Sequence, residues 1–191
     1  MDADSALVVL TIGHSTHPID EFVEILRAHQ VGLLVDVRTV PKSRHNPQFN
    51  SDALAESLSG AGIGYERMAA LGGLRHPRPD SPNGGWRNDS FRGYADYMQT
   101  QPFAEALEVL LDRAAERRTA IMCAEAVPWR CHRSIIADAL VVRSIPVLHI
   151  MSATSARPHT LHSFARVEGR RIMYPPVDVA TDPPTPDGAP R

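Results

Sequence analysis

Short, almost continuously apolar runs alternate with longer amphipathic segments along this chain. Residues 7–13, LVVLTIG, and residues 33–38, LLVDVR, predict buried strands, because their apolar positions are consecutive and glycine or charge appears only near the end. Between these runs, Ile19, Phe22 and Leu26 fall on one face of a helix. This pattern is the strand–helix–strand unit from which parallel sheets are built.

The same alternation continues along the rest of the chain. Strands are predicted at residues 64–68, at 119–125 (TAIMCAE), at 145–150 (IPVLHI) and at 170–176 (RRIMYPP). Helices are predicted at residues 51–63, from Tyr94 onward, from Pro102 onward, and at residues 131–143.

Strands separated by helices predict a largely parallel sheet with helices on both of its faces. A chain of 191 residues has the length of one such domain. We therefore expect a single three-layer α/β domain over residues 1–176. Residues 177–191, VDVATDPPTPDGAPR, are proline-rich and lack a core-facing pattern, so they are predicted to form a mobile tail.

One long segment, residues 71–92, breaks the alternation with four glycines and three prolines and shows no periodicity. A loop of this length in a compact domain is often functional. We expect it to close over a pocket, with Arg75 or Arg87 reaching the ligand. The alternative is a disordered surface excursion.

Composition narrows the class of protein. Hydrophobic residues make up 43% of the chain and charged residues 22%, which is ordinary for a globular protein. A net charge of -2 argues against strong overall attraction to nucleic acid or membrane, although not against a local basic patch. No apolar run approaches the roughly 20 residues of a membrane span, and the acidic N-terminus does not resemble a signal peptide. We expect a cytoplasmic protein without a membrane partner and with reduced thiols.

Polar and titratable side chains follow the predicted strands at their carboxyl ends, where ligands sit in open α/β sheets. These residues are His14, Ser15, Asp36, Arg38, Lys42, Arg44, Cys123, Glu125 and His149. Because parallel strands end at the same edge of a sheet, we expect most of them to converge on one cavity.

The segment MCAEAVPWRCHR, residues 122–133, contains both cysteines of the chain. Cys131 lies near a predicted helix start beside arginines, which favours the thiolate form. The residues are compatible with Cys131 or Cys123 as a nucleophile or redox thiol. The groups expected to assist by acid/base chemistry or proton transfer are Glu125, Asp36, His14 and His132.

Two other interpretations of these residues stay open. Free cysteine is among the most buried residue types, so both thiols could be simple packing groups. Cys123, Cys131, His132 and His14 could instead form a zinc site, although no characteristic metal-ligand spacing is present.

Basic residues gather in the loops and helix starts near the expected cavity, and they predict an anionic ligand such as a phosphate, a nucleotide or a carboxylate. We expect Arg38 and Arg133 to bind the anion directly. The further substrate-binding candidates are Ser15, Lys42, Arg44, Arg75 and Arg87.

Several motifs stand in a recognisable order: TIGHST, DVRTVPKSRHNPQF, LGGLR, CAEAVPWRCHRSIIADAL and VLHI. Over Thr11 to Ile150 the chain resembles the bacterial family catalogued as domain of unknown function 488. The resemblance supports the α/β fold and the choice of site residues. It leaves the reaction open.

The sequence favours an enzyme, a thiol- or acid/base-dependent hydrolase or transferase, acting on a small or polymer-borne anionic substrate. The alternatives are a nucleotide- or nucleic-acid-binding module without catalysis and a protein with a Cys/His metal site. The residues indicate neither a particular cofactor nor an oligomeric state.

Overall fold

The computed structural model describes residues 7–176, so the predicted tail at 177–191 lies outside the described part. The main sheet has six strands in the order β3-β2-β4-β1-β5-β6. They are β1 (Val9–Gly13), β2 (Leu33–Asp36), β3 (Gly64–Arg67), β4 (Thr119–Cys123), β5 (Val147–Ser152) and β6 (Ser155–Pro158). Neighbouring strands from β3 to β5 are parallel, and β6 alone runs antiparallel to β5. The predicted α/β class with a largely parallel sheet is confirmed.

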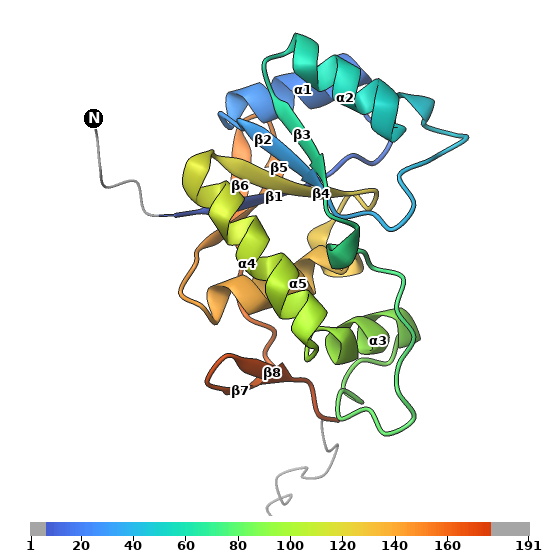
Figure 1. The fold of residues 1–191 in the computed structure, drawn as a ribbon, viewed down its shortest axis with the longest axis vertical. Coiled ribbons are helices and arrows are strands. Elements are labelled where there is room, and N and C mark those ends of the chain that lie inside the picture. The colour runs from blue at the N-terminus through green and yellow to red at the C-terminus, as the bar shows by residue number, and fades with distance from the viewer. Residues whose placement is uncertain (1–6, 177–191) are drawn as a thin grey trace, which may run out of the picture.

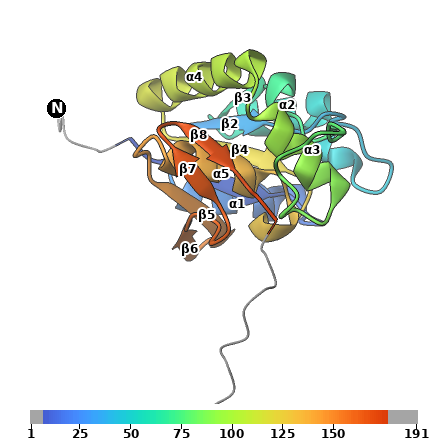
Figure 2. The ribbon, with the colours of Figure 1, turned by 90° about the horizontal axis from the view of Figure 1, so that it is seen from below.

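Helices cover both faces of this sheet, as Figures 1 and 2 show. One layer contains α1 (Ile19–Ala28) and α2 (Ser51–Gly60). The opposite layer contains α3 (Asp89–Tyr97), α4 (Gln101–Glu116) and α5 (Arg133–Val141). The three-layer arrangement follows from the sequence, because strands that are apolar at consecutive positions need a cover on each side.

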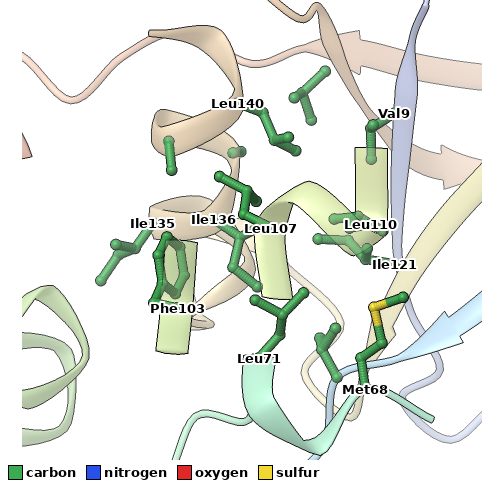
Figure 3. Close-up of a cluster of buried hydrophobic side chains, with 14 of the residues drawn as sticks. Val9, Met68, Leu71, Phe103, Leu107, Leu110, Ile121, Ile135, Ile136 and Leu140 are labelled. Carbon is green, nitrogen blue, oxygen red and sulfur yellow. The ribbon is translucent and has the colours of Figure 1, made fainter. Parts of the chain in front are cut away.

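Alternate residues of the strands point to opposite faces of the sheet, where they pack into two separate hydrophobic cores. Leu10 and Leu34 face α1 and α2, where they join the buried side chain of Phe22. Val9 and Ile121 point to the other face and pack against α4 and α5 (Figure 3). The side chains labelled in Figure 3 are Val9, Met68, Leu71, Phe103, Leu107, Leu110, Ile121, Ile135, Ile136 and Leu140.

The C-terminal part of the described chain departs from the prediction. Residues 170–176 contain β8 (Arg171–Met173), which pairs with β7 (Arg166–Glu168) in a separate two-stranded hairpin. Neither β6 nor β7 was expected, since both are short and lack a buried apolar run. Ile172 and Tyr174 are nonetheless fully buried and close the core beneath α4 and α5.

Two helix boundaries differ from the sequence prediction. Helix α3 begins at Asp89, before the expected start at Tyr94, because the side chain of Asn88 accepts hydrogen bonds from the N–H groups of Ser90 and Phe91. Helix α5 begins at Arg133, so Cys131 lies just before it and directly after a short 3-10 helix, Pro128–Arg130.

The topology opens a crevice between β1 and β4. These strands are neighbours, but β1 leads to α1 on one face of the sheet, whereas β4 leads to α5 on the other. Such a switch point is where open α/β sheets bind ligands. Within residues 7–176 the structure has no helix with the length and hydropathy needed to cross a membrane.

Candidate functional site

The loops that follow β1 and β4 come into direct contact at the switch point. Gly13 pairs with Cys123 at the last position of the two strands. A Cβ atom at Gly13 would lie 1.8 Å from the carbonyl oxygen of Glu125, so this approach requires glycine. Ser15 then turns the chain with a positive φ of 48°, and its N–H donates to the carbonyl of Ala124.

Arg133, the first residue of α5, lies beneath this contact and is 1% exposed. Its Nε donates to Sγ of Cys123 at 2.9 Å, and its two terminal nitrogens donate to Oγ1 of Thr11 at 3.3 Å and to the Glu125 carbonyl at 2.7 Å. Within residues 7–176 no carboxylate lies within 4.0 Å of the guanidinium. A buried cation needs a negative partner, and here the adjacent groups that can supply one are the thiols.

The two cysteines form a coupled pair that differs in acidity. Burial and a hydrogen bond to Cys131 raise the pKa of the Cys123 thiol well above its ordinary value. Burial would also raise the pKa of Cys131, but the hydrogen bonds from Cys123 and His132 and the charge of Arg133 hold it well below the ordinary value. Of the two thiols, Cys131 is therefore the more acidic and Cys123 the one that keeps its proton more firmly.

His132 lies beside Cys131 in a fixed orientation. Its Nε2–H donates to the Val37 carbonyl at 3.1 Å, which leaves Nδ1 facing Sγ of Cys131 at 3.5 Å. The ring packs against Tyr94 on one side, with 4.9 Å between ring centroids, and against the backbone of Gly73. A thiol, an imidazole and an orienting carbonyl are thus aligned in series.

A second buried group borders the same edge of the sheet. Asp36 and Arg38 form a bidentate ion pair, with the shorter contact at 2.6 Å, and Tyr65 donates its hydroxyl to Asp36 at 2.8 Å. Arg38 also donates to Nε2 of His14 at 3.2 Å, and Nδ1–H of His14 donates to the Ser15 carbonyl. Burial, together with the nearby Arg38, lowers the pKa of His14 to about 4, so this imidazole is neutral at pH 7.

A pocket of about 370 Å³ opens over the thiols, and we call it the thiol pocket. Its titratable lining residues are Arg38, Cys123, Glu125, Arg130, Cys131 and His132. The rest of its wall is mostly apolar or small: Thr39, Val40, Gly73, Leu74, Ser90, Phe91 and Ala124. The long loop at 71–92 supplies part of this wall, through Gly73 and Leu74 near its start and Ser90 and Phe91 near its end.

The structure places the remaining predicted residues at different distances from the thiol pocket. His14, Ser15 and Lys42 line an adjoining hollow of about 410 Å³, which shares Arg38 and Glu125 with the thiol pocket. Arg133 and Asp36 lie behind the wall of the thiol pocket, where they hold other groups in place.

Three predicted cations lie away from both hollows. The guanidinium of Arg75 stacks on the Tyr97 ring, 3.6 Å from the ring centroid, and Arg75 also donates to the carbonyls of Gly72 and Ala70. Arg44 and Arg87 are exposed and belong to neither lining.

A second polar cluster lies on the other side of α5, and we call it the histidine cluster. The buried Asp138 accepts hydrogen bonds from Nε2 of His159 at 2.7 Å, from Nδ1 of His162 at 2.6 Å and from the Tyr174 hydroxyl at 2.6 Å. Burial would raise the pKa of Asp138, but these hydrogen bonds hold it below its ordinary value, so the group is a carboxylate. His149 extends the cluster by contacting Nδ1 of His159 at 2.9 Å.

Sequence reasoning did not identify the members of the histidine cluster apart from His149. Asp138 sits within a predicted helix between apolar neighbours, and His159 and His162 follow an unexpected strand. The signal available in the sequence was Asp138 itself, an acidic residue at a core-facing position of a helix. A buried carboxylate requires hydrogen-bonding or charged partners, so such a residue indicates a polar cluster. The spacing of His159 and His162, three residues apart in a loop, carries no metal or catalytic signature by itself.

Comparison with known proteins gives one match. A family model described as domain of unknown function DUF488 matches residues 18–140 of the chain. The match covers α1 to α5, including β2, β4 and the segment with both cysteines. No curated protein and no solved structure matches the chain significantly.

Proposed function

Because the chain belongs to the DUF488 family, whose description assigns no reaction, we propose a function from the site alone: the thiol pocket is an active site with Cys131 as its nucleophile. The enzyme would be a hydrolase or transferase for substrates that carry an anionic group. Arg133 and Cys123 position the nucleophile and stabilise its charge.

One observation carries the proposal: Sγ of Cys131 lies 3.5 Å from Nδ1 of His132, and Nε2 of that ring is anchored on the Val37 carbonyl. A nucleophile, a base and an orienting acceptor in series are the arrangement that activates a thiol. Cys131 and His132 both line the thiol pocket, so a substrate there can reach them.

The chemistry that these groups support has two steps. The Cys131 thiolate, whose proton is held on Nδ1 of His132, attacks an electrophilic centre and forms a bond to it. The bond from that centre to the leaving group breaks, and the leaving group departs with the proton from Nδ1 of His132. Water or a second acceptor then attacks the covalent intermediate, gives its proton back to His132 and releases the thiolate. His132 thus acts as acid in the first step and as base in the second.

The charged side chains around the thiols indicate that the substrate is an anion. Arg130 lines the thiol pocket and is exposed, and its side chain makes no hydrogen bond or ion pair within residues 7–176, so its guanidinium is available to an anion. Arg38 also lines the pocket, but its nitrogens are engaged by Asp36, Phe49 and His14. We therefore assign direct contact with the anion to Arg130 and a supporting charge to Arg38.

The wall of the pocket indicates a second property of the substrate. Val40 and Leu74 line the thiol pocket and are 60% and 69% exposed, and Phe91 adds a partly buried ring. Apolar side chains that face solvent at a pocket mouth favour a ligand with an apolar part. The proposed substrate therefore joins an anionic group to an apolar portion near the reacting centre.

The test uses two alkylating agents that differ in charge, iodoacetate and iodoacetamide. Alkylation is measured by mass spectrometry at pH 7 on the full chain. We expect both to modify Cys131, and the ratio of the iodoacetate rate to the iodoacetamide rate to exceed that of free cysteine, because Arg130 attracts the carboxylate. Arg130→Gln should lower this ratio, and the exposed Arg87→Gln should not. Alkylation at Cys123 alone, or an unchanged ratio in Arg130→Gln, would contradict the proposal.

Turnover is tested separately on a panel of 4-nitrophenyl phosphates, anionic 4-nitrophenyl esters and acyl thioesters. Any activity found should disappear in Cys131→Ser and persist in His76→Gln, whose side chain is exposed and away from the pocket. Activity that survives in Cys131→Ser would remove the thiol from the mechanism.

The alternative of a nucleic-acid-binding module predicts a different salt dependence. A protein that contacts roughly 6–10 phosphates of a duplex loses roughly 10³–10⁵ in affinity between 50 and 200 mM salt. A pocket that holds one anion through Arg130 should show a far shallower slope with mononucleotides and short oligonucleotides alike. Tight oligonucleotide binding with a steep slope would favour the binding module instead.

A further inference from the structure

The histidine cluster brings together three side chains that are typical metal ligands. One ring nitrogen of His159, one ring nitrogen of His162 and a carboxylate oxygen of Asp138 lie within 4.8 Å of one another. They come from α5, from the residue after β6 and from the loop before β7, so three separate parts of the fold converge on one point. Within residues 7–176 no other group of three histidine, cysteine or acidic side chains converges in this way.

We propose that Asp138, His159 and His162 bind a divalent transition metal ion of the zinc or iron(II) class. Two imidazoles and one carboxylate are a donor set that zinc and non-haem iron share. The present contacts of 2.6 and 2.7 Å between the ligand atoms are hydrogen bonds. Around a tetrahedral zinc ion with bonds of about 2.1 Å, such atoms stand about 3.4 Å apart. Each of these nitrogen–oxygen separations therefore has to grow by about 0.7–0.8 Å for an ion to fit between the atoms.

The surroundings of the ligands already have the form that metal sites use. His159 directs its second nitrogen, Nδ1, at Nε2 of His149, 2.9 Å away, and His149 in turn contacts Oγ1 of Thr11 at 2.7 Å. In metal sites the ligating histidine donates its other N–H to such a partner, which fixes the ring and increases its basicity. Tyr174 orients the carboxylate of Asp138 in a similar way, since its hydroxyl donates to Oδ2.

The hydrogen bonds that join Thr11, His149 and His159 fit both the metal-free and the metal-bound form of the histidine cluster. Without a metal, Thr11 donates to His149, His149 donates to His159, and His159 donates to Asp138. With a metal on Nε2 of His159, the same contacts work in the opposite direction: His159 donates to His149, and His149 donates to Thr11. Every nitrogen keeps its partner, so binding requires no rearrangement of His149 or Thr11.

Access to the ion is provided by a separate pocket of about 260 Å³. It is lined by His149, His159 and His162, together with Trp129 and Arg157. None of these residues lines the thiol pocket. Three protein ligands leave at least one coordination position free, and a pocket beside them admits water or a ligand to that position. This arrangement is the one expected of an open metal site, as opposed to a closed structural one.

The two sites are physically connected through Arg133. Its guanidinium donates both to Thr11, which contacts His149, and to Cys123. A divalent charge at Asp138 would therefore act on the thiols through a short chain of hydrogen bonds. The metal proposal does not depend on the proposed function, because it rests on a different set of residues and a different pocket.

The experiment is a metal titration of the full chain after removal of any affinity tag and treatment with a chelator. We expect one Zn²⁺ per chain by elemental analysis after gel filtration, and a visible absorption band with Co²⁺ that reports nitrogen and oxygen ligands. His159→Gln and His162→Gln should each lose stoichiometric metal. His149→Phe should weaken binding by roughly 10–100-fold, as loss of an orienting partner does.

Two controls decide the location. His76→Gln, at an exposed histidine, should bind one equivalent like the wild type. The double variant Cys123→Ser/Cys131→Ser should also keep its metal. Binding that survives in both His159→Gln and His162→Gln, or that disappears with the cysteines, would overturn the assignment. So would a wild-type chain that retains no stoichiometric Zn²⁺ after gel filtration.

Discussion

The imidazole of His132 rests directly on the backbone of Gly73: a Cβ atom at position 73 would lie 2.4 Å from Nδ1, the atom that faces Cys131. The glycine belongs to the long loop, and the histidine precedes α5. Their contact shows that the loop helps to fix the ring that faces Cys131. It therefore has a role in the site besides forming a wall of the pocket.

Gly73→Ala should displace His132 while leaving the fold in place, because Gly73 is only half-buried and the core lies elsewhere. We expect the alkylation rate of Cys131 at pH 7 to fall about tenfold, since a displaced imidazole no longer stabilises the thiolate. Circular dichroism and the urea midpoint should remain close to wild type. Gly60→Ala, where a Cβ meets nothing within 4 Å, is the matched control and should leave the rate unchanged.

The low pKa of Cys131 predicts an unusual pH profile of alkylation. An ordinary thiol reacts about tenfold faster for each pH unit below its pKa of about 8.5, because only the thiolate is nucleophilic. Because its pKa lies well below the ordinary value, Cys131 should instead show a much smaller rise in rate over the pH range in which an ordinary thiol ionises. The measurement is the rate of iodoacetamide incorporation, with site assignment by peptide mapping. A rate that climbs steadily through this range would show that the thiol is protonated at neutral pH.

Removal of Asp36 should destabilise the fold strongly. Its side chain is fully buried and balances the buried Arg38, and Tyr65 donates to it as well. Asp36→Ala leaves an unpaired buried cation, which costs about 3–5 kcal/mol of unfolding free energy. The exposed ion pair of Arg78 with Asp80, at 3.8 Å, is the matched control, and Asp80→Ala should cost no more than about 1 kcal/mol. Urea denaturation measures both, and similar costs would contradict the assigned role of Asp36.

Stability should fall in acid because of His14. Its pKa is about 4 in the folded chain against 6.5 for the unperturbed side chain, so the unfolded chain binds more protons between these values. The stabilising contribution is fully present above pH 6.5, is lost as pH falls toward 4, and amounts to at most about 3 kcal/mol. Arg38, Asp36 and Arg133 face the imidazole, and the two arginines disfavour its protonation. In His14→Gln the free energy of unfolding should change less with pH over this window. An identical pH dependence in the two proteins would show that His14 is not the titrating group.

The sequence predicted the site best where regular structure determines the position of a residue. Cys123 and His14 lie at the carboxyl ends of apolar runs that the sequence predicts as buried parallel strands, so their position at one edge of the sheet followed from the fold class, whereas the pairing of these two strands did not. The orientation of long side chains was not predictable in this way. Arg75 turns onto the Tyr97 ring and Arg133 turns inward to the thiols, because each finds a partner contributed by another element.

The histidine cluster shows a second limit. Asp138 and His162 lie far apart in the sequence, in an apolar helix and in an irregular segment. No periodicity connects such residues, and their contact exists only because the last segment of the described chain folds back across α5. A buried acid can be suspected from its helical position, but its partner depends on the path of a loop whose sequence has no regular pattern.

The position of β1 has a consequence for how the protein is made. This strand is synthesised before the other described strands, yet it occupies the middle of the sheet, between β4 and β5, and its hydrogen-bonding partners begin at Thr119 and Val147. During synthesis both edges of β1 therefore stay unpaired until β4 and β5 have been translated. Pairing between strands so distant in sequence is slow. We expect nascent chains that stall before β5 has emerged to expose an apolar strand with unpaired edges, and such species are prone to aggregate.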